Sequence, residues 1–312
     1  DDVTSLCRTD HAEVLNERLV AAESGGPYSE LDPFNPEPSA YTEGQKKAIF
    51  IRVDFDDLQG VPVSDSTLTT ILSNVNNFYS EMSYGRASFF LMGQGSDMTP
   101  TFRLTNAAAY YGTNNFYAKL RTDARAAATA AGYTLSNYQF DVICFGAVPG
   151  WTWGGLGYVG APGSWVRNSF GSSGSVTAHE LGHNFGLNHA NHWDTGGQSI
   201  IGEGTSVEYG DSFDNMGAAS SIPNGHYNAR YKNYLDWLKS NEVQTVSSSG
   251  TYRIFTHDNA SSTGIRGLKI LKAGSTNYWV EFRQKFTSNK WLMSGVGLRW
   301  AQTGNQKSHL LD

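Results

Sequence analysis

The sequence lacks the long apolar run that a membrane-spanning helix requires. Such a helix needs about 20 consecutive, predominantly apolar residues, and no stretch of this 312-residue chain approaches that length. Basic residues are not in surplus either, because 23 lysines and arginines face 29 acidic residues and the net charge is −6. Binding nucleic-acid phosphates requires a basic surface. We therefore expect neither a membrane span nor a nucleic-acid partner.

Cysteine is nearly absent. Cys7 and Cys144 are the two cysteines, so one internal disulfide is available. In an oxidising compartment this bridge would tie the N-terminal segment to the body of the protein and close a very long loop. We favour this disulfide over the alternative of two unpaired thiols, with Cys144 buried in a strand.

Glycine and aromatic residues are abundant, whereas charged residues are few. The chain contains 34 glycines, 16 phenylalanines, 16 tyrosines and 8 tryptophans, and 17% of its residues are charged. This composition is typical of an extracellular globular protein with long, tightly turned loops. The length allows one large domain or two smaller ones, each with its own core.

The segment HELGHNFGLNH, residues 179–189, brings chemistry-bearing residues together. In a helix, residues four apart share one face, so His179 and His183 point at one place. A continued helix would turn His189 away from that place. Gly186 provides the break, since glycine adopts left-handed conformations without penalty and ends helices. We therefore expect His189 to fold back beside the first two histidines.

Three imidazoles with one open position form a catalytic rather than a structural zinc site, and no cysteine lies nearby to close it. Glu180 directly follows the first histidine, where a general base would take a proton from water at the metal. The alternative is a helix whose histidines are capped or packed without metal. We predict one catalytic Zn²⁺ held by His179, His183 and His189.

The pattern HExxHxxGxxH followed by a methionine turn is the signature of the metzincin metalloproteases, and this chain resembles them. Met216, in the segment EYGDSFDNMG, is the candidate turn methionine, and the alternative is an ordinary core methionine. The resemblance implies that it lies under the imidazoles without binding the ion. YGDSFDNMG, HNFGLNHA and HYNARYKNYLDWL are most similar to the gametolysin family (peptidase family M11). The match covers residues 175–240.

One position departs from the metzincin pattern. Some members place a tyrosine two residues after the methionine, where it approaches the metal, but Ala218 occupies that position here. Either no tyrosine serves, or Tyr227 or Tyr231 does.

Hydrophobic periodicity predicts alternating strands and helices before the histidine motif. The expected elements are strands at 48–55, 87–92 and 140–145, and helices at 66–82 with Asp65 as N-cap and at 114–131. A further helix, which carries His179, is expected to have Ser175 as its N-cap. This order indicates an α/β (α+β) fold. The resemblance implies a metzincin-like domain with a twisted, mostly parallel sheet, a backing helix and an active-site helix.

Three parts of the chain differ in composition and hydrophobic pattern. Residues 1–44 are expected to form an N-terminal helix and an extended linker, and residues 45–240 the catalytic domain, closed by a helix at 227–239. Short alternating runs with turn residues between them predict a smaller β-rich C-terminal module at 241–312.

The glycine-rich, aromatic stretch before the motif holds the expected substrate cleft. In metzincins the edge strand preceding the zinc helix binds a peptide as an added strand. The resemblance therefore makes Gly155, Leu156, Gly157 and Tyr158 the cleft candidates, with neighbouring tryptophans shaping subsites. The alternative is that the aromatic residues pack a large loop against the domain.

Two further features carry weaker signals. Asp54, Asp56 and Asp57 have the ligand type of a Ca²⁺ site, but a solvated acidic turn at a strand end is the preferred interpretation. His192 receives no role, because three ligands already suffice. Cys7 as a metal-directed latency switch is a third reading of that residue, although SLCRTD does not clearly match such a motif.

The sequence therefore predicts a secreted zinc endopeptidase that acts on protein or peptide substrates as a monomer. The chain opens on Asp1-Asp2 without a signal peptide, which we interpret as the mature form of a zymogen. Two alternatives stay open: a glycan-dependent, mucin-type protease, and a non-catalytic adhesin or binding protein on a metzincin scaffold.

Overall fold

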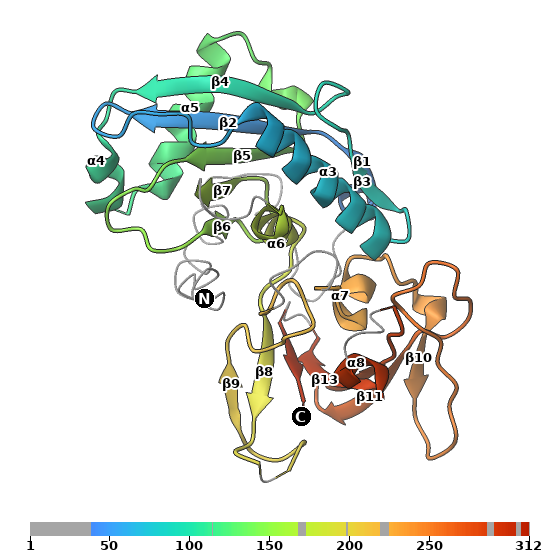
Figure 1. Ribbon diagram of the computed structural model, residues 1–312. Helices are drawn as coiled ribbons and strands as arrows, with labels where there is room; N and C mark the ends of the chain where they lie inside the picture. Colours follow the sequence, from blue (N-terminus) through green and yellow to red (C-terminus); the bar gives the residue numbers. More distant parts are fainter. Residues whose placement is uncertain are drawn as a thin grey trace. The chain divides into compact units, whose positions relative to one another are not determined.

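The structure is a computed structural model of the chain, in which two compact units are distinguished (Figure 1). It describes residues 39–113, 115–167, 173–197, 199–218, 225–285, 290–303 and 307–311. Within these ranges the first unit comprises residues 45–79 and 88–184, and the second comprises 39–44, 80–87 and 185 onward. The helix expected at 3–24 lies outside the described residues. The domain boundaries at 44 and 240 stay predictions.

The first unit is built on a five-stranded, mostly parallel sheet. Its strand order is β4 (Asp97–Leu104), β2 (Ala48–Phe55), β5 (Phe140–Phe145), β7 (Ser164–Arg167) and β6 (Gly155–Gly157). All neighbours are parallel except β6, which runs antiparallel to β7 at one edge. The mixed α/β class and the strands at 48–55 and 140–145 are therefore confirmed.

Two strands of this sheet are absent from the sequence-based prediction. β4 contains Pro100 and alternates weakly, and β7 is four residues long, so neither has a clear strand pattern. The strand expected at 87–92 is shorter, β3 (Ala87–Phe89), and pairs with β1 (Gly44–Lys46) in a separate two-stranded sheet.

Helices cover both faces of the sheet (Figure 1). The apolar face of α5 (Tyr117–Ala130) packs against alternate residues of β2 in one core. Leu120 and Ala124 of the helix and Ile49, Ile51 and Val53 of the strand belong to this core. α3 (Asp65–Met82) crosses the other face. The unit also contains α4 (Ala108–Thr113), the 3₁₀ turn η2 (Leu135–Asn137) and α6 (Ser175–Asn184).

The first turn of α3 corrects one prediction. Ser64, not Asp65, provides the cap, because its Oγ accepts a hydrogen bond from Thr67 N at 3.1 Å. Asp65 is the first helical residue and instead accepts a hydrogen bond from Arg52 at 2.5 Å. A serine hydroxyl satisfies the open N–H groups of a first turn as well as a carboxylate does.

The expected Cys7–Cys144 disulfide is not seen. Cys144 carries a free thiol and is 3% exposed in β5, between β2 and β7 of the sheet. Burial raises the pKa of this thiol to about 12, so it remains protonated and inert. Cys7 lies outside the described residues.

The second unit contains a seven-stranded sheet. Its strand order is β10 (Val243–Val246), β11 (Gly267–Ala273), β12 (Thr276–Glu281), β13 (Gly297–Gln302), β14 (Ser308–Leu310), β8 (Ala190–Asp194) and β9 (Thr205–Val207). The pairs β10–β11 and β14–β8 are parallel, and the other pairs are antiparallel. The β-rich character expected after residue 241 is therefore found, and strands from before that residue extend the same sheet.

The helices of this unit are short. They are α2 (Ser39–Thr42), α7 (Ala229–Tyr234), the 3₁₀ turn η3 (Ser240–Glu242) and α8 (Lys290–Met293). α7 is shorter than the predicted 227–239 because Asn228 caps it, accepting a hydrogen bond from Tyr231 N, and Asp236 has a positive φ of 61°. None of the helices in the described ranges has the length and apolar character to cross a membrane.

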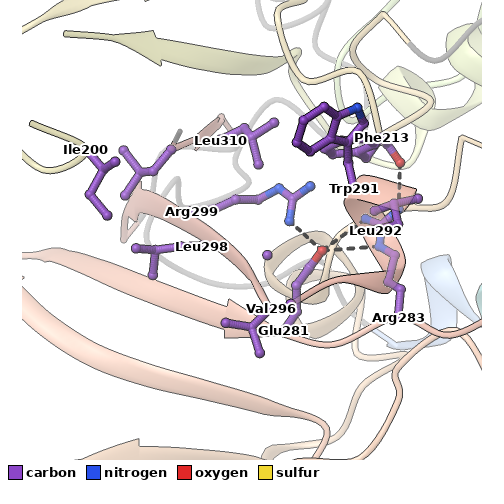
Figure 2. A pocket seen from close by; sticks show the side chains of 13 residues that line it. Ile200, Phe213, Glu281, Arg283, Trp291, Leu292, Val296, Leu298, Arg299 and Leu310 are labelled. Atoms are coloured by element: carbon purple, nitrogen blue, oxygen red, sulfur yellow. Dashed lines mark hydrogen bonds and ion pairs between the residues drawn. The ribbon is translucent and has the colours of Figure 1, made fainter. Parts of the chain in front are cut away.

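Buried charged side chains lie close together in the second unit, and Figure 2 shows three of them, Glu281, Arg283 and Arg299. Arg299 donates to both carboxylate oxygens of Asp211, at 2.7 and 3.2 Å, and also to Glu281. Arg283 reaches Glu281 at 3.0 Å and the carbonyl oxygen of Phe213 at 2.6 Å. Glu281, Arg283 and Arg299 are the charged residues that line a cavity of about 460 Å³, whose other lining residues are largely apolar.

Candidate metal centre

The first two histidines are carried by α6 (Ser175–Asn184), all ten residues of which are buried. Ser175 is the first residue of this helix rather than the predicted N-cap. Tyr79 anchors it to α3 by donating its hydroxyl to Ala178 O at 2.7 Å. The rings of His179 and His183 lie 4.8 Å apart at an interplanar angle of 82°, as the four-residue spacing requires.

The chain leaves the helix where the sequence predicts. α6 ends at Asn184, and Gly186 has a φ of +107°, a value that strongly favours glycine. His189 consequently folds back, and the candidate ligand atoms of His179, His183 and His189 all lie within 4.8 Å of one another. No other group of three His, Cys, Asp or Glu side chains in the described ranges meets the same criterion. We call these three residues the metal centre.

The donor set of the metal centre fits a metal ion. The three histidines are 1 to 2% exposed. Their Nε2 atoms are buried and make no hydrogen bond to the described part of the chain, while each ring has other contacts. Three neutral imidazole nitrogens without a thiolate suit zinc. The centre is therefore compatible with zinc.

Glu180 directly follows His179 on α6. It is 3% exposed, and burial raises the pKa of its carboxyl well above the usual value. Oε2 is buried without a hydrogen-bond partner in the described ranges. A buried carboxyl group with a raised pKa is a typical feature of a proton-transfer site.

Strand β6 approaches Glu180 through its glycines. A Cβ atom added to Gly155 would lie 2.4 Å from Glu180 Oε1, and one added to Gly157 would lie 2.7 Å from Glu180 O. Any side chain at these positions would displace the carboxylate or the helix. The glycines expected to line the cleft therefore permit the close contact between β6 and α6.

The other cleft candidates point into the core of the first unit. Leu156 is 1% exposed and Tyr158 6% exposed, and both belong to the same apolar core as Trp165. Trp151 and Trp153 also pack in this core, with stacked rings 4.8 Å apart. The structure thus supports the alternative in which these aromatic residues pack a large loop against the domain. Substrate binding along the backbone of 155–158 stays a prediction.

Asn184 is a structural residue of the site that sequence reasoning missed. Its amide donates to Tyr158 O at 3.0 Å and to Gly163 O at 2.9 Å, and its oxygen accepts from Ser164 Oγ at 2.8 Å. In the same region, Gly160 N donates to His183 O at 2.8 Å. These bonds fix the end of α6 to the β6–β7 connection. No short-range pattern in the sequence marks this contact.

Met216 is hydrogen-bonded to Ala190, the residue that follows the third histidine. It is fully buried, and its carbonyl oxygen accepts a hydrogen bond from Ala190 N at 2.8 Å. Asp214 holds the turn, because its carboxylate accepts from Met216 N at 2.8 Å and from Asn228 N at 2.7 Å. The role of Met216 as the floor of the metal centre remains a prediction.

Tyr227 and Tyr231, the two tyrosines considered for a role at the metal, both make contacts within the protein. The Tyr231 hydroxyl lies 2.9 Å from both Asn188 O and His189 O, so it braces the backbone of the third histidine. Tyr227 is fully buried and stacks on Trp237.

The proposed calcium ligands are engaged in protein contacts. Asp54 accepts two hydrogen bonds from Arg103, at 2.7 and 2.8 Å, which lower the pKa of its carboxyl. Asp57 accepts one from Ala108 N at 2.6 Å. These contacts explain the acidic residues at the end of β2 without a metal ion.

Comparison with known proteins yields structural likeness alone. No protein-family profile and no curated protein matches the sequence. Similar structures include wild-type OgpA from Akkermansia muciniphila in two crystal forms. One has 12% identity and a TM-score of 0.41 and covers 85% of this chain and 92% of OgpA. The other has 13% identity and a TM-score of 0.39 and covers 77% and 71%. Catalytically inactive OgpA in complex with an O-glycopeptide (glycodrosocin) substrate has 12% identity and a TM-score of 0.41, with coverage of 85% and 91%.

Proposed function

We propose that this protein is a secreted, zinc-dependent endopeptidase of the metzincin type, most similar to the gametolysin family. One observation carries the proposal: the candidate ligand atoms of three buried histidines lie within 4.8 Å of one another. The sequence order HExxHxxGxxH puts a buried glutamate directly after the first of them. A structural zinc site has four protein ligands, and this centre offers three.

His179, His183 and His189 would hold the ion. Zinc at such a site supplies a Lewis acid, which polarises a carbonyl oxygen and lowers the pKa of water to about 7. Glu180 is the general base that takes the proton from the attacking water and then passes it to the leaving amine.

The substrate would lie along β6. This strand is at the edge of the sheet, and its glycines bring its backbone against Glu180. A peptide that pairs with such an edge is held through main-chain hydrogen bonds. The peptide would then be bound in an extended conformation, with its scissile carbonyl at the metal centre. Because main-chain atoms make these contacts, binding would depend little on the sequence of the peptide.

Replacing the base tests the reaction. Glu180→Gln preserves size and hydrogen-bonding shape, so we expect zinc binding and the fold to persist while cleavage of casein or gelatin falls by about 10²- to 10⁴-fold. Glu203→Gln, an exposed carboxylate change, is the matched control and should cleave normally. Wild-type turnover by Glu180→Gln would exclude this mechanism. Inhibition by 1,10-phenanthroline and a zinc content of one ion per chain, by elemental analysis, are the accompanying expectations.

Cleavage assays with a mucin, before and after deglycosylation, separate the alternative functions. Cleavage of a mucin that stops after enzymatic deglycosylation would identify a glycan-dependent protease. Cleavage of both forms would identify a general endopeptidase. Zinc binding without cleavage of any protein substrate would favour a binding protein on this scaffold.

A further inference from the structure

Glu208 contacts the third histidine directly. It follows β9, and its Oε1 lies 2.7 Å from Nδ1 of His189. The His189 side chain is 2% exposed and that of Glu208 is 31% exposed, so the hydrogen bond is largely shielded from water. A carboxylate oxygen can only accept here, which makes Nδ1 the protonated nitrogen of the ring and leaves the Nε2 lone pair available.

Tyr209 holds the same ring from another side. Its ring centroid lies 3.8 Å from that of His189, at an interplanar angle of 35°. Its backbone has a φ of +59°, which costs a bulky residue about 1 kcal/mol or more. Tyr209 N donates to Asn191 Oδ1 at 3.2 Å, which helps to hold this conformation. The strained backbone places the side chains of two successive residues against one imidazole.

His189 needs such support more than the other two histidines. His179 and His183 are one turn apart on a buried helix, which fixes their separation. His189 lies beyond that helix, after the reversal at Gly186. A ligand on a loop loses more conformational freedom when it binds a metal, unless the fold restrains it beforehand.

We infer that Glu208 is a positioning residue for the third metal ligand. It fixes the tautomer and orientation of His189 and increases the basicity of Nε2, as carboxylate partners of metal-bound histidines do. Tyr209 restricts rotation of the same ring. This inference rests on the proposed function, because it requires a metal at His179, His183 and His189.

The competing explanation is that Glu208 serves Lys307. Burial lowers the pKa of Lys307 and the Glu208 charge raises it, so the two side chains interact electrostatically. If charge balance were the role of Glu208, removing Lys307 would have an effect similar to removing Glu208. The hydrogen bond to His189 predicts instead that loss of Glu208 alone impairs the metal centre.

Zinc affinity tests the inference without relying on activity. For the full chain, competition with a chromophoric chelator should show zinc binding about 10- to 100-fold weaker in Glu208→Ala than in the wild type. Glu208→Gln retains an acceptor oxygen for Nδ1, so it should recover part of the loss. Glu203→Ala on the same segment and Lys307→Met should bind zinc as the wild type does. The Co²⁺-substituted protein should show an altered ligand-field spectrum in Glu208→Ala alone.

Two results would overturn the inference. One is a Glu208→Ala protein whose zinc affinity stays within about twofold of the wild type. The other is an equal loss in Glu208→Ala and Lys307→Met, which would assign the effect to charge balance. A wild-type protein that binds no zinc would be a different failure, because it would remove the proposed function itself.

Discussion

The two units differ in what fills their centres. In the first unit all eight residues of β2 are buried, and Ile49, Ile51 and Val53 pack against a helix with apolar and small residues. In the second unit Arg299, Glu281 and Asp211 are 1%, 3% and 0% exposed and form one ion-pair network. A buried apolar side chain contributes wherever it packs, whereas a buried charge is tolerable only beside its partner.

This difference has a consequence for how each unit responds to change. Core substitutions in the first unit should cost in proportion to the volume removed. In the second unit the loss of one charged group leaves another buried without compensation. The four predictions below, from the largest expected effect to the smallest, test this contrast.

Arg299→Met should destabilise the protein by about 3–5 kcal/mol, because it leaves the Asp211 and Glu281 carboxylates buried without their shared partner. Urea unfolding followed by tryptophan fluorescence would measure the loss. Arg299→Lys keeps the charge but not the two-pronged contact with Asp211, so it should lose less. A loss of under about 1 kcal/mol in the methionine variant would show that the network contributes little.

Acidification from pH 6.5 to 4 should weaken the second unit by on the order of 3 kcal/mol. Burial lowers the pKa of His257 and His309 from 6.5 to about 4 and that of His226 well below 6.5. These rings stay neutral in the fold while the unfolded chain takes up protons, so stability falls as the pH drops through this range. Asp214 opposes the trend, since burial and Asp211 raise its pKa to about 7.

The first unit should not lose stability over the same range, and Glu180, whose pKa burial raises, should slightly favour the folded state as the pH falls. The pKa of Asp141, which burial alone would raise, is lowered by Arg121 and Arg125, so its contribution is lost only below the unfolded value of 3.8. Hydrogen exchange at pH 7 and pH 4.5, corrected for intrinsic rates, would compare amides of β11–β13 with those of β2 and β5. Equal loss of protection in both sheets would contradict the expected difference in acid sensitivity between the two units.

Ile51→Val in the apolar core should cost about 0.5–1.5 kcal/mol, since one buried methylene group is removed and the cavity that remains is small. The measurement is the shift of the urea midpoint at an unchanged slope. A loss as large as that of Arg299→Met would mean that the first unit is as intolerant of change as the second.

Lys119→Ala removes a surface ion pair with Asp123, four residues on in α5, and should change stability by less than about 0.5 kcal/mol. The Lys119 side chain is 45% exposed, so water replaces the contact. The change in melting temperature should be near the limit of detection. A larger effect would show that exposed and buried ion pairs are not distinguished in this protein as we expect.

Several features were predictable because they depend on short stretches of sequence. Alternation in AIFIRVDF predicts a buried strand, and apolar spacing from Leu68 to Met82 predicts an amphipathic helix. The reversal at Gly186 follows from the positive φ that the motif requires. The expectations that differed involved partners distant in sequence: the Cys7–Cys144 bridge was not seen, and β4 and β7 were missed.

By itself, the sequence determined the donor set of the metal centre and the class of the fold, since four-residue spacing, one glycine and strand periodicity act within a few residues of each other. Only the tertiary structure decided that Glu208 meets His189, that Asn184 ties α6 to the β6–β7 connection, and that Arg299 joins Asp211 to Glu281. These contacts join positions up to 88 residues apart. Local periodicity carries no information about them, because each depends on which strands the folded chain brings together.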